Sequence, residues 1–227
     1  MVSKLCVQAV IFDMDGVLCD SEPFICEAAI QMLEERYGTR AIPSDFTPFV
    51  GMGEDRFIGG VAEKYGLPLH LESDKARTYA IYLELIQGRL QPLCGAREFM
   101  AASRARGWKL AVASSADSVK VTGNLSEIGI PPSTFDAVVN GLDVERRKPE
   151  PDLFLLAAKR IGVDPACCIV VEDAPAGIQA AVAAGAVALG IASSFSEDAL
   201  VEAGARWTAR DLGEAMMLLP LWAGEQA

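Results

Sequence analysis

The stretch QAVIFDMDGVLCDSE, residues 8–22, decides the fold. The apolar run at residues 10–12 is β-branched and aromatic and is followed by a turn at Gly16, which predicts the buried end of a β-strand. Asp13 and Asp15 come next, and side chains two residues apart tend to share a side of a strand. Two carboxylates this close raise each other's pKa unless a cation or a shared proton offsets them. The pair therefore indicates a metal site, a proton-sharing pair or a solvent-facing strand end.

Length and composition limit the class of protein. The 227 residues are 51% hydrophobic and 22% charged, which is typical of a globular protein with a sizeable core. The net charge of −11 argues against nucleic acid as the main partner. The six cysteines are scattered and show no zinc-ligand spacing, so we expect a reduced, soluble intracellular protein, with the cytoplasm as its location unless a targeting segment directs it to an organelle. No apolar run approaches the roughly 18 residues of a membrane span, so we expect no membrane insertion.

Two sequence regions follow different patterns. Residues 20–92 contain three helical patterns and little strand, which predicts a small helical cap domain. From residue 93 onward, apolar strands such as LAVAS, AVVNG, CCIVVED and VALGIAS alternate with helices. This alternation is typical of a doubly wound α/β core with a parallel sheet covered on both faces. We therefore expect a core made of residues 1–19 and 93–227, with the cap inserted after the first strand.

Polar residues lie at the ends of four predicted strands or in the loops after them. Asp13 and Asp15 follow the first strand, while Ser114 and Ser115 end another. The remaining groups are Lys148, in the loop RRKPEP, and the pair Glu172 and Asp173 after CCIVV. Each group alone fits a structural role in a turn or a helix cap. Because ligands of open α/β sheets bind outside the carboxyl ends of the strands, the set together predicts one site.

The four motifs FDMDGVL, AVASS, RRKPEPDLF and VVEDAPAGIQAA resemble those of the haloacid-dehalogenase superfamily. The match spans essentially the whole chain, and the helical insert is similar to the cap of the β-phosphoglucomutase-like branch. The cap stretch PFVGMGEDRFIGGVAEKYG, together with AVASSADSVKV, also resembles the hydrolase domain of plant suppressor-of-quenching proteins. That second likeness implies a domain that acts in the chloroplast stroma, with other domains of a longer chain as partners.

The residues and the resemblance lead to one chemistry. Asp13 would attack phosphorus and also bind Mg²⁺, while Asp15 would exchange the proton of the leaving alcohol and of water. The metal set would be Asp13, Asp15 (through its backbone carbonyl, as the resemblance implies), Asp173 and Glu172, because Mg²⁺ prefers oxygen ligands. The groups expected to hold the phosphoryl oxygens are Ser114, Ser115 and Lys148. The expected function is Mg²⁺-dependent hydrolysis of a small phosphorylated metabolite through an aspartyl-phosphate.

Two other functions stay open. One is a sugar phosphomutase, although Ile25 stands near the position where the resemblance implies a histidine and Glu54 where it implies an arginine. The other is a mainly regulatory or interaction domain with weak phosphatase activity. Substrate choice is expected to depend on a cap loop that includes Gly51, Gly53, Glu54 and Arg56.

Overall fold

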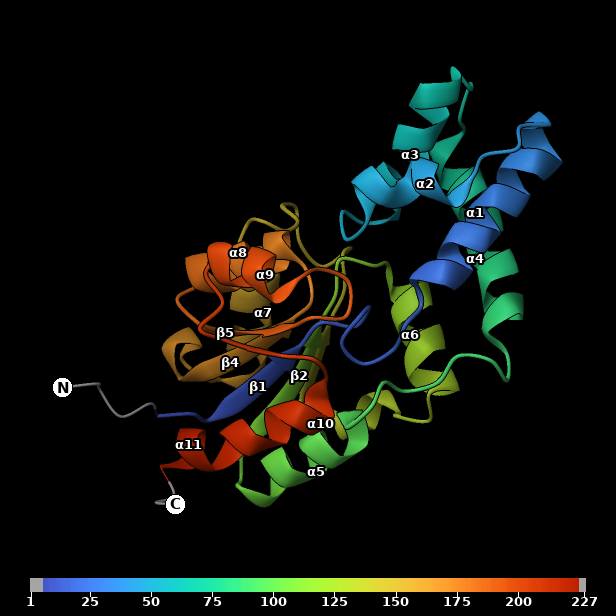
Figure 1. The fold of residues 1–227 in the computed structure, drawn as a ribbon. Coiled ribbons are helices and arrows are strands. Elements are labelled where there is room, and N and C mark those ends of the chain that lie inside the picture. Colours follow the sequence, from blue (N-terminus) through green and yellow to red (C-terminus); the bar gives the residue numbers. More distant parts are fainter. Residues whose placement is uncertain (1–5, 225–227) are drawn as a thin grey trace.

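The computed structural model describes residues 6–224 and contains a six-stranded parallel sheet in the order β3-β2-β1-β4-β5-β6 (Figure 1). The strands are β1 (Ala9–Phe12), β2 (Lys109–Ala113), β3 (Ala137–Val139), β4 (Cys168–Glu172), β5 (Val187–Ile191) and β6 (Trp207–Ala209). The N-terminal strand β1 lies at the centre of the sheet between β2 and β4, and Phe12 pairs with both Val112 and Val171. The expected doubly wound α/β fold is confirmed. The strand β6 was not predicted, because its residues WTA stand between Arg206 and Arg210 and form no apolar run.

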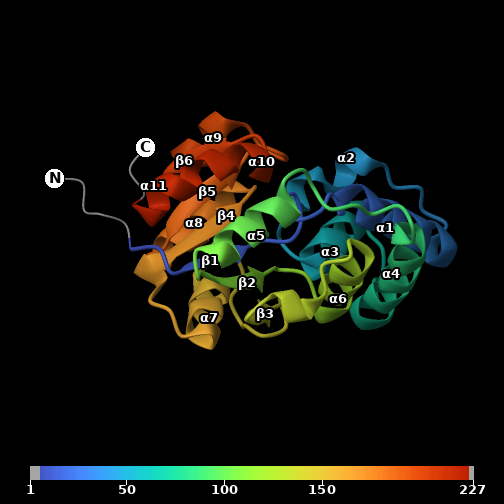
Figure 2. The same ribbon diagram turned by 90° about the horizontal axis from the view of Figure 1, so that it is seen from below.

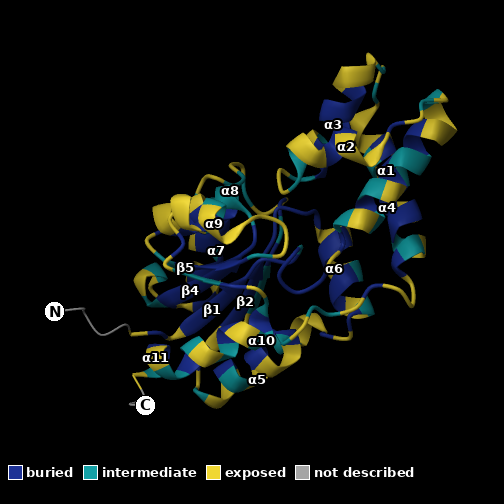
Figure 3. Cartoon of the chain, viewed as in Figure 1, coloured by how far each residue is buried: buried dark blue, intermediate teal, exposed yellow. Residues whose placement is uncertain are grey.

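Helices cover both faces of the sheet, with α5, α10 and α11 on one face and α7, α8 and α9 on the other (Figure 1). Their bounds are α5 (Ala96–Ala105), α6 (Ser118–Glu127), α7 (Asp152–Ile161), α8 (Pro175–Ala183), α9 (Glu197–Glu202), α10 (Leu212–Ala215) and α11 (Leu219–Ala223). Short 3-10 turns span Thr47–Phe49, Pro132–Thr134, Pro165–Cys167 and Met216–Leu218. All four residues of β1 are buried, with Val10 and Phe12 in one hydrophobic cluster and Ala9 and Ile11 in the other (Figure 3). The alternation along the strand thus divides the core into two layers.

The segment between β1 and α5 folds into helices that stand beside the sheet (Figures 1 and 2). They are α1 (Glu22–Tyr37), α2 (Pro43–Phe46), α3 (Glu54–Tyr65) and α4 (Leu71–Ile86). The chain leaves and re-enters the sheet domain at one place, because Cys19 pairs with Pro92 and the Leu93 N–H donates to the Leu18 carbonyl at 2.9 Å. A cap between residues 20 and 92 stays our proposed division. No helix among the described residues has the length and apolar character needed to cross a membrane.

Salt bridges tie the cap to the sheet domain beside the expected site. Lys75 of α4 lies 2.7 Å from Asp117, which precedes α6, and 2.6 Å from Asp55 of α3. Arg147, one residue before Lys148, lies 3.6 Å from both Asp55 and Asp117. Two basic and two acidic side chains, one of each from the cap and one of each from the sheet domain, therefore form a charge network across the contact.

Candidate active site

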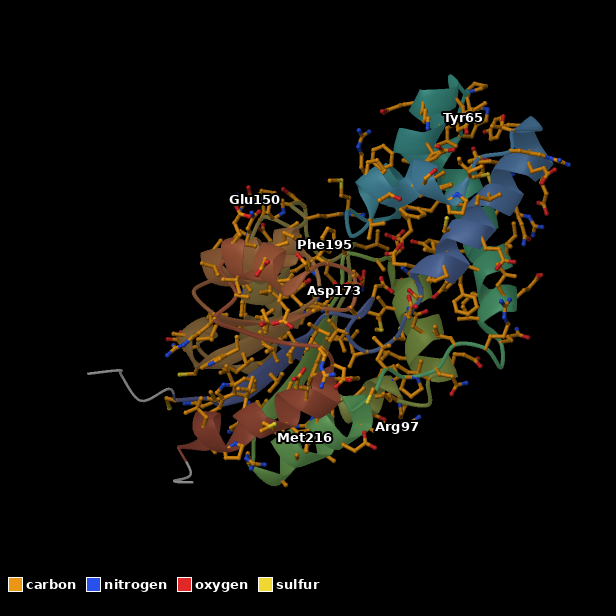
Figure 4. All side chains as sticks on the ribbon, viewed as in Figure 1. Tyr65, Arg97, Glu150, Asp173, Phe195 and Met216 are labelled. Carbon is orange, nitrogen blue, oxygen red and sulfur yellow. The ribbon has the colours of Figure 1, made fainter. Side chains whose placement is uncertain are left out.

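A cavity opens at the carboxyl edge of the central strands, where the cap meets the sheet. Figure 4 shows Asp173 at the edge of the sheet domain that faces the cap, and Tyr65 on α3 of the cap. The residues that line the cavity are Asp13, Asp15, Glu22, Ile25, Phe49, Val50, Gly51, Gly53, Glu54, Phe57, Ser114, Ser115, Ala116, Lys120, Lys148, Glu172, Asp173, Ala174, Ala176 and Gly177. Residues from both sides of the proposed division thus line one cavity.

Three carboxylates meet in the sheet-side wall of the cavity. Asp13, Glu172 and Asp173 each offer an oxygen, and these oxygens lie within 4.8 Å of one another. The parallel register explains this meeting, because the Asp13 N–H donates to the Val171 carbonyl at 2.9 Å and so places the ends of β1 and β4 side by side. A group of buried oxygen ligands fits a hard divalent cation such as Mg²⁺.

Burial makes Asp13 and Asp173 hard to ionise without a cation. It raises the pKa of Asp13 to about 7, against the effect of the Lys148 ammonium and with the help of Glu172 and Asp15. Burial also raises the pKa of Asp173 well above its usual range, and the neighbouring Glu172 and Asp13 add to the rise. The site therefore stores electrostatic repulsion that a bound cation relieves.

Lys148 is the cation that this wall already holds. Its Nζ lies 2.6 Å from Asp13 Oδ1 and also donates to Glu172 Oε1, and its side chain is only 5% exposed. Although burial lowers it, the carboxylates of Asp13 and Glu172 raise the pKa of Lys148 overall. The ammonium is therefore charged at neutral pH and restrains the carboxylate of Asp13.

Two glycines allow these carboxylates to approach the backbone. A Cβ on Gly16, whose φ is +72°, would lie 1.9 Å from Asp173 Oδ2. A Cβ on Gly177 at the start of α8 would lie 2.0 Å from the carboxyl carbon of Glu172. A side chain at either position would collide with a carboxylate. Glycine at both positions therefore leaves room for the carboxylates of Asp173 and Glu172.

Ser114 and Ser115 are buried at the end of β2 and line the same cavity. The Ala116 N–H donates to Ser114 Oγ at 3.1 Å. Ser115 Oγ is buried and has no hydrogen-bond partner among residues 6–224. A buried hydroxyl without a partner is unfavourable, so Ser115 is suited to a polar ligand.

Asp15 lies apart from the three-carboxylate group. Its Oδ1 accepts a hydrogen bond from Ser21 Oγ, with Asn124 Nδ2 at 3.5 Å, and its Oδ2 lies 2.8 Å from Lys120 Nζ. The side chain of Asp15 is thus held toward α6 and the start of the cap, while that of Asp13 is held toward Lys148. The two aspartates of the DxD pair have separate surroundings.

The predicted cap loop reaches the cavity in part. Gly51, Gly53 and Glu54 line it, and the Glu54 side chain is buried there. Arg56 is not among the lining residues, because it turns outward to Glu63 at 3.0 Å and its side chain is 51% exposed. Ile25 lines the cavity as well.

Sequence analysis missed Lys120 and Glu22, which also line the cavity. In the sequence, Lys120 lies in the helical pattern SVKVTGNLSEIG, where a lysine usually faces solvent. A signal was present, since Lys120, Val121, Asn124 and Leu125 are spaced as one buried face of α6. Glu22 stands at the first position of α1, where an acidic residue is common in any helix, so its type alone does not indicate a site.

A parallel sheet with buried carboxylates at its carboxyl edge and a helical cap over them defines an α/β enzyme with a metal-compatible site. Residues 7–185 match the hydrolase family described as haloacid dehalogenase-like hydrolase. The chain belongs to this family. The predicted superfamily and the predicted hydrolase class are thereby confirmed.

Individual relatives agree with this family. The chain is 41% identical over 210 residues to Protein SUPPRESSOR OF QUENCHING 1, chloroplastic, of Arabidopsis thaliana, covering 91% of this chain but 20% of that protein. It is 34% identical over 212 residues to the phosphorylated carbohydrates phosphatase of Thermotoga maritima, covering 88% of this chain and 92% of that one. The structure of β-phosphoglucomutase from Clostridium difficile shares the fold, with a TM-score of 0.83, 20% identity and coverage of 96% and 98%. The chain thus spans about a fifth of the length of its plant relative.

Proposed function

We propose that the chain is a Mg²⁺-dependent phosphatase of small phosphorylated metabolites that works through a phosphorylated Asp13. The observation that supports this most is the convergence of Asp13, Glu172 and Asp173 within 4.8 Å beside the buried ammonium of Lys148. A carboxylate can approach an anionic phosphate ester only where positive charge offsets the repulsion. Mg²⁺ would be held by Asp13, Asp173 and Glu172, with the Asp15 carbonyl as a further ligand, and would supply that positive charge.

The protein's own residues would act in two steps. Asp13 attacks phosphorus, the bond from phosphorus to the ester oxygen breaks, and Asp15 gives its proton to the leaving alcohol. Asp15 then takes a proton from water, which attacks the phosphorus of phospho-Asp13 and releases inorganic phosphate with the Asp13 carboxylate. Lys148 and the hydroxyls of Ser114 and Ser115 would bind the non-bridging phosphoryl oxygens throughout.

The cap side of the cavity favours hydrolysis over the mutase alternative. A phosphomutase must hold a second phosphate, whereas the cap presents the buried carboxylate of Glu54 and the apolar side chain of Ile25. Arg56 and Arg77 are paired with cap glutamates, at 3.0 Å from Glu63 and 2.9 Å from Glu35. We therefore propose monophosphates as substrates. The name of the Thermotoga maritima relative supports phosphorylated carbohydrates as the first class to test.

Phosphate release from a panel of phosphorylated metabolites and p-nitrophenyl phosphate, with and without Mg²⁺, tests the proposal. We expect selective release that EDTA abolishes reversibly and that Asp13→Asn lowers by at least about 10³-fold with the fold intact. Asp198→Asn, an exposed aspartate of α9, is the matched control and should keep full activity. Undiminished hydrolysis by Asp13→Asn would exclude the mechanism. No release from any compound would favour the regulatory alternative, with other domains of a longer chain as partners.

A further inference from the structure

Lys120 of α6 is a buried charge to which the mechanism above gives no role. Its side chain is 2% exposed, and it lines the cavity from the side of the core. A lysine is rarely buried to this degree unless acidic partners surround it, because removing an ammonium from water is unfavourable. The position of Lys120 therefore depends on what its ammonium contacts.

The ammonium lies between a carboxylate of the core and one of the cap. Lys120 Nζ is 2.8 Å from Asp15 Oδ2 and 3.3 Å from Glu54 Oε1. Asp15 follows β1 in the sheet domain, whereas Glu54 begins α3 in the cap. Two acids from separate domains fix the end of a side chain that is otherwise flexible.

Lys120 supplies the hydrogen-bond donor for one of the two carboxylate oxygens of Asp15. Ser21 Oγ donates to Oδ1, and Asn124, one turn after Lys120 on α6, is itself held by the hydroxyl of Tyr82 from cap helix α4. Oδ2 has Lys120 as its donor within residues 6–224. The carboxylate of Asp15 is therefore oriented by groups that belong to, or contact, the cap.

We propose that Lys120 is a positioning residue that orients the carboxylate of Asp15 for proton transfer and, through Glu54, links this orientation to the closed cap. The proposal rests on the phosphatase function above, in which Asp15 exchanges the proton. With the cap against the core, Glu54 and Asp15 hold the ammonium from two sides. When the cap moves away, Glu54 leaves, and the ammonium of Lys120 loses one of the two carboxylates that fix its position beside Asp15.

The dependence of kcat/KM on the leaving group distinguishes positioning from a purely structural role. An alkyl alcohol must receive a proton as its bond to phosphorus breaks, whereas p-nitrophenolate leaves without one. Because kcat/KM covers the steps up to phospho-Asp13, it isolates the proton donation by Asp15. The probes are the best alkyl monoester of the panel and p-nitrophenyl phosphate.

We expect Lys120→Met to lower kcat/KM for the alkyl ester at least about ten-fold more than for p-nitrophenyl phosphate. Lys120→Arg keeps the positive charge and should recover most of this difference. Lys75→Met is the matched control, because it removes a cap-to-core ion pair with Asp117 without touching Asp15. In this control the ratio of the two kcat/KM values should stay at the wild-type value.

Equal losses for the two esters in Lys120→Met would overturn the proposal and leave Lys120 a structural residue. If Lys120→Met does not fold by circular dichroism, Lys120→Gln and Lys120→Arg carry the same comparison, and equal losses there overturn it too. A crystal structure of a folded variant with Asp15 unmoved would also overturn it. Wild-type protein that hydrolyses neither ester would instead exclude the proposed function itself.

Discussion

The cavity has two halves that contain equal numbers of acidic and basic side chains in different arrangements. The sheet half has three carboxylates and one lysine, all from the ends of core strands or the loops after them: Asp13, Glu172, Asp173 and Lys148. The cap half also has three carboxylates and one lysine, but two of its members belong to the cap: Asp15, Glu22, Glu54 and Lys120. In the described part of the chain, only the sheet half brings three carboxylate oxygens within 4.8 Å of one another.

The two halves have similar charges but differ in how their side chains are held in place. In the sheet half, hydrogen bonds between parallel strands fix the backbone at Asp13 and Glu172, so the ligands are placed before anything binds. In the cap half, Lys120 lies between the two domains and its contacts depend on the distance between them. A fixed half is suited to a metal and a phosphoryl group, and a separable half is suited to recognition and gating.

Removal of Lys148 should produce the largest change in stability. Lys148→Met leaves Asp13 and Glu172 buried without their cation, and breaking a buried ion pair this way costs about 3–5 kcal/mol. We expect the free energy of unfolding in EDTA, measured by urea denaturation, to fall by about that amount. Lys64→Met is the control, since the Lys64 side chain is 57% exposed beside Asp45 and solvent screens this ion pair, so the free energy of unfolding should change far less. Equal effects of both variants would contradict a preformed sheet half.

Metal binding should produce the second largest change in the free energy of unfolding, and this change should be an increase. Bound as proposed, Mg²⁺ would relieve the repulsion among the three buried carboxylates, so at about 100 times its Kd it should stabilise the protein by about 2.7 kcal/mol. Thermal unfolding with Mg²⁺ or with NaCl of equal ionic strength measures this shift. Asp173→Asn should abolish the shift yet be at least as stable as wild type in EDTA, because it removes one of the repelling charges. A Mg²⁺ shift that persists in Asp173→Asn would place the metal elsewhere.

The sheet half was predictable from sequence because its residues follow strands. Once LAVAS and CCIVVED are recognised as parallel strands, their carboxyl ends must meet, and Ser114 and Asp173 come to the same edge as Asp13. No such rule applies to Lys120. Its burial depends on the packing of α6 against α4 and on the approach of Glu54, which are contacts between segments far apart in sequence.

The cap was predictable as helices but not in its orientation. The predicted helical region of residues 20–92 includes α3, which has Glu54 at its start, yet only the fold shows that Glu54 enters the cavity and Arg56 does not. Side chains two positions apart on a helix point about 200° from each other, so one of them faces outward when the other faces the core. Which one does so depends on how the cap packs against the sheet domain.

A change of pH should act on the cap half and should produce the smallest of the three changes in the free energy of unfolding. Burial raises the pKa of Glu22 to about 7, and the carboxylates of Asp15 and Glu54 add to the rise while Lys120 opposes it. Because the folded pKa lies above the ordinary value of 4.5, the folded protein binds the proton more tightly than the unfolded chain. This contribution to stability is complete below pH 4.5 and is lost as the pH rises through 7.

Glu22→Gln tests this pH dependence. The variant should flatten the fall in the free energy of unfolding between pH 4.5 and 7 by about 1–2 kcal/mol, measured by urea denaturation at a series of pH values in EDTA. Glu27→Gln, an exposed position of the same helix, is the matched control and should keep the wild-type slope. If the free energy of unfolding fell equally with pH in Glu22→Gln and in wild type, burial would not raise the pKa of Glu22 in the folded protein. In that case the two halves of the cavity would differ in geometry but not in electrostatics.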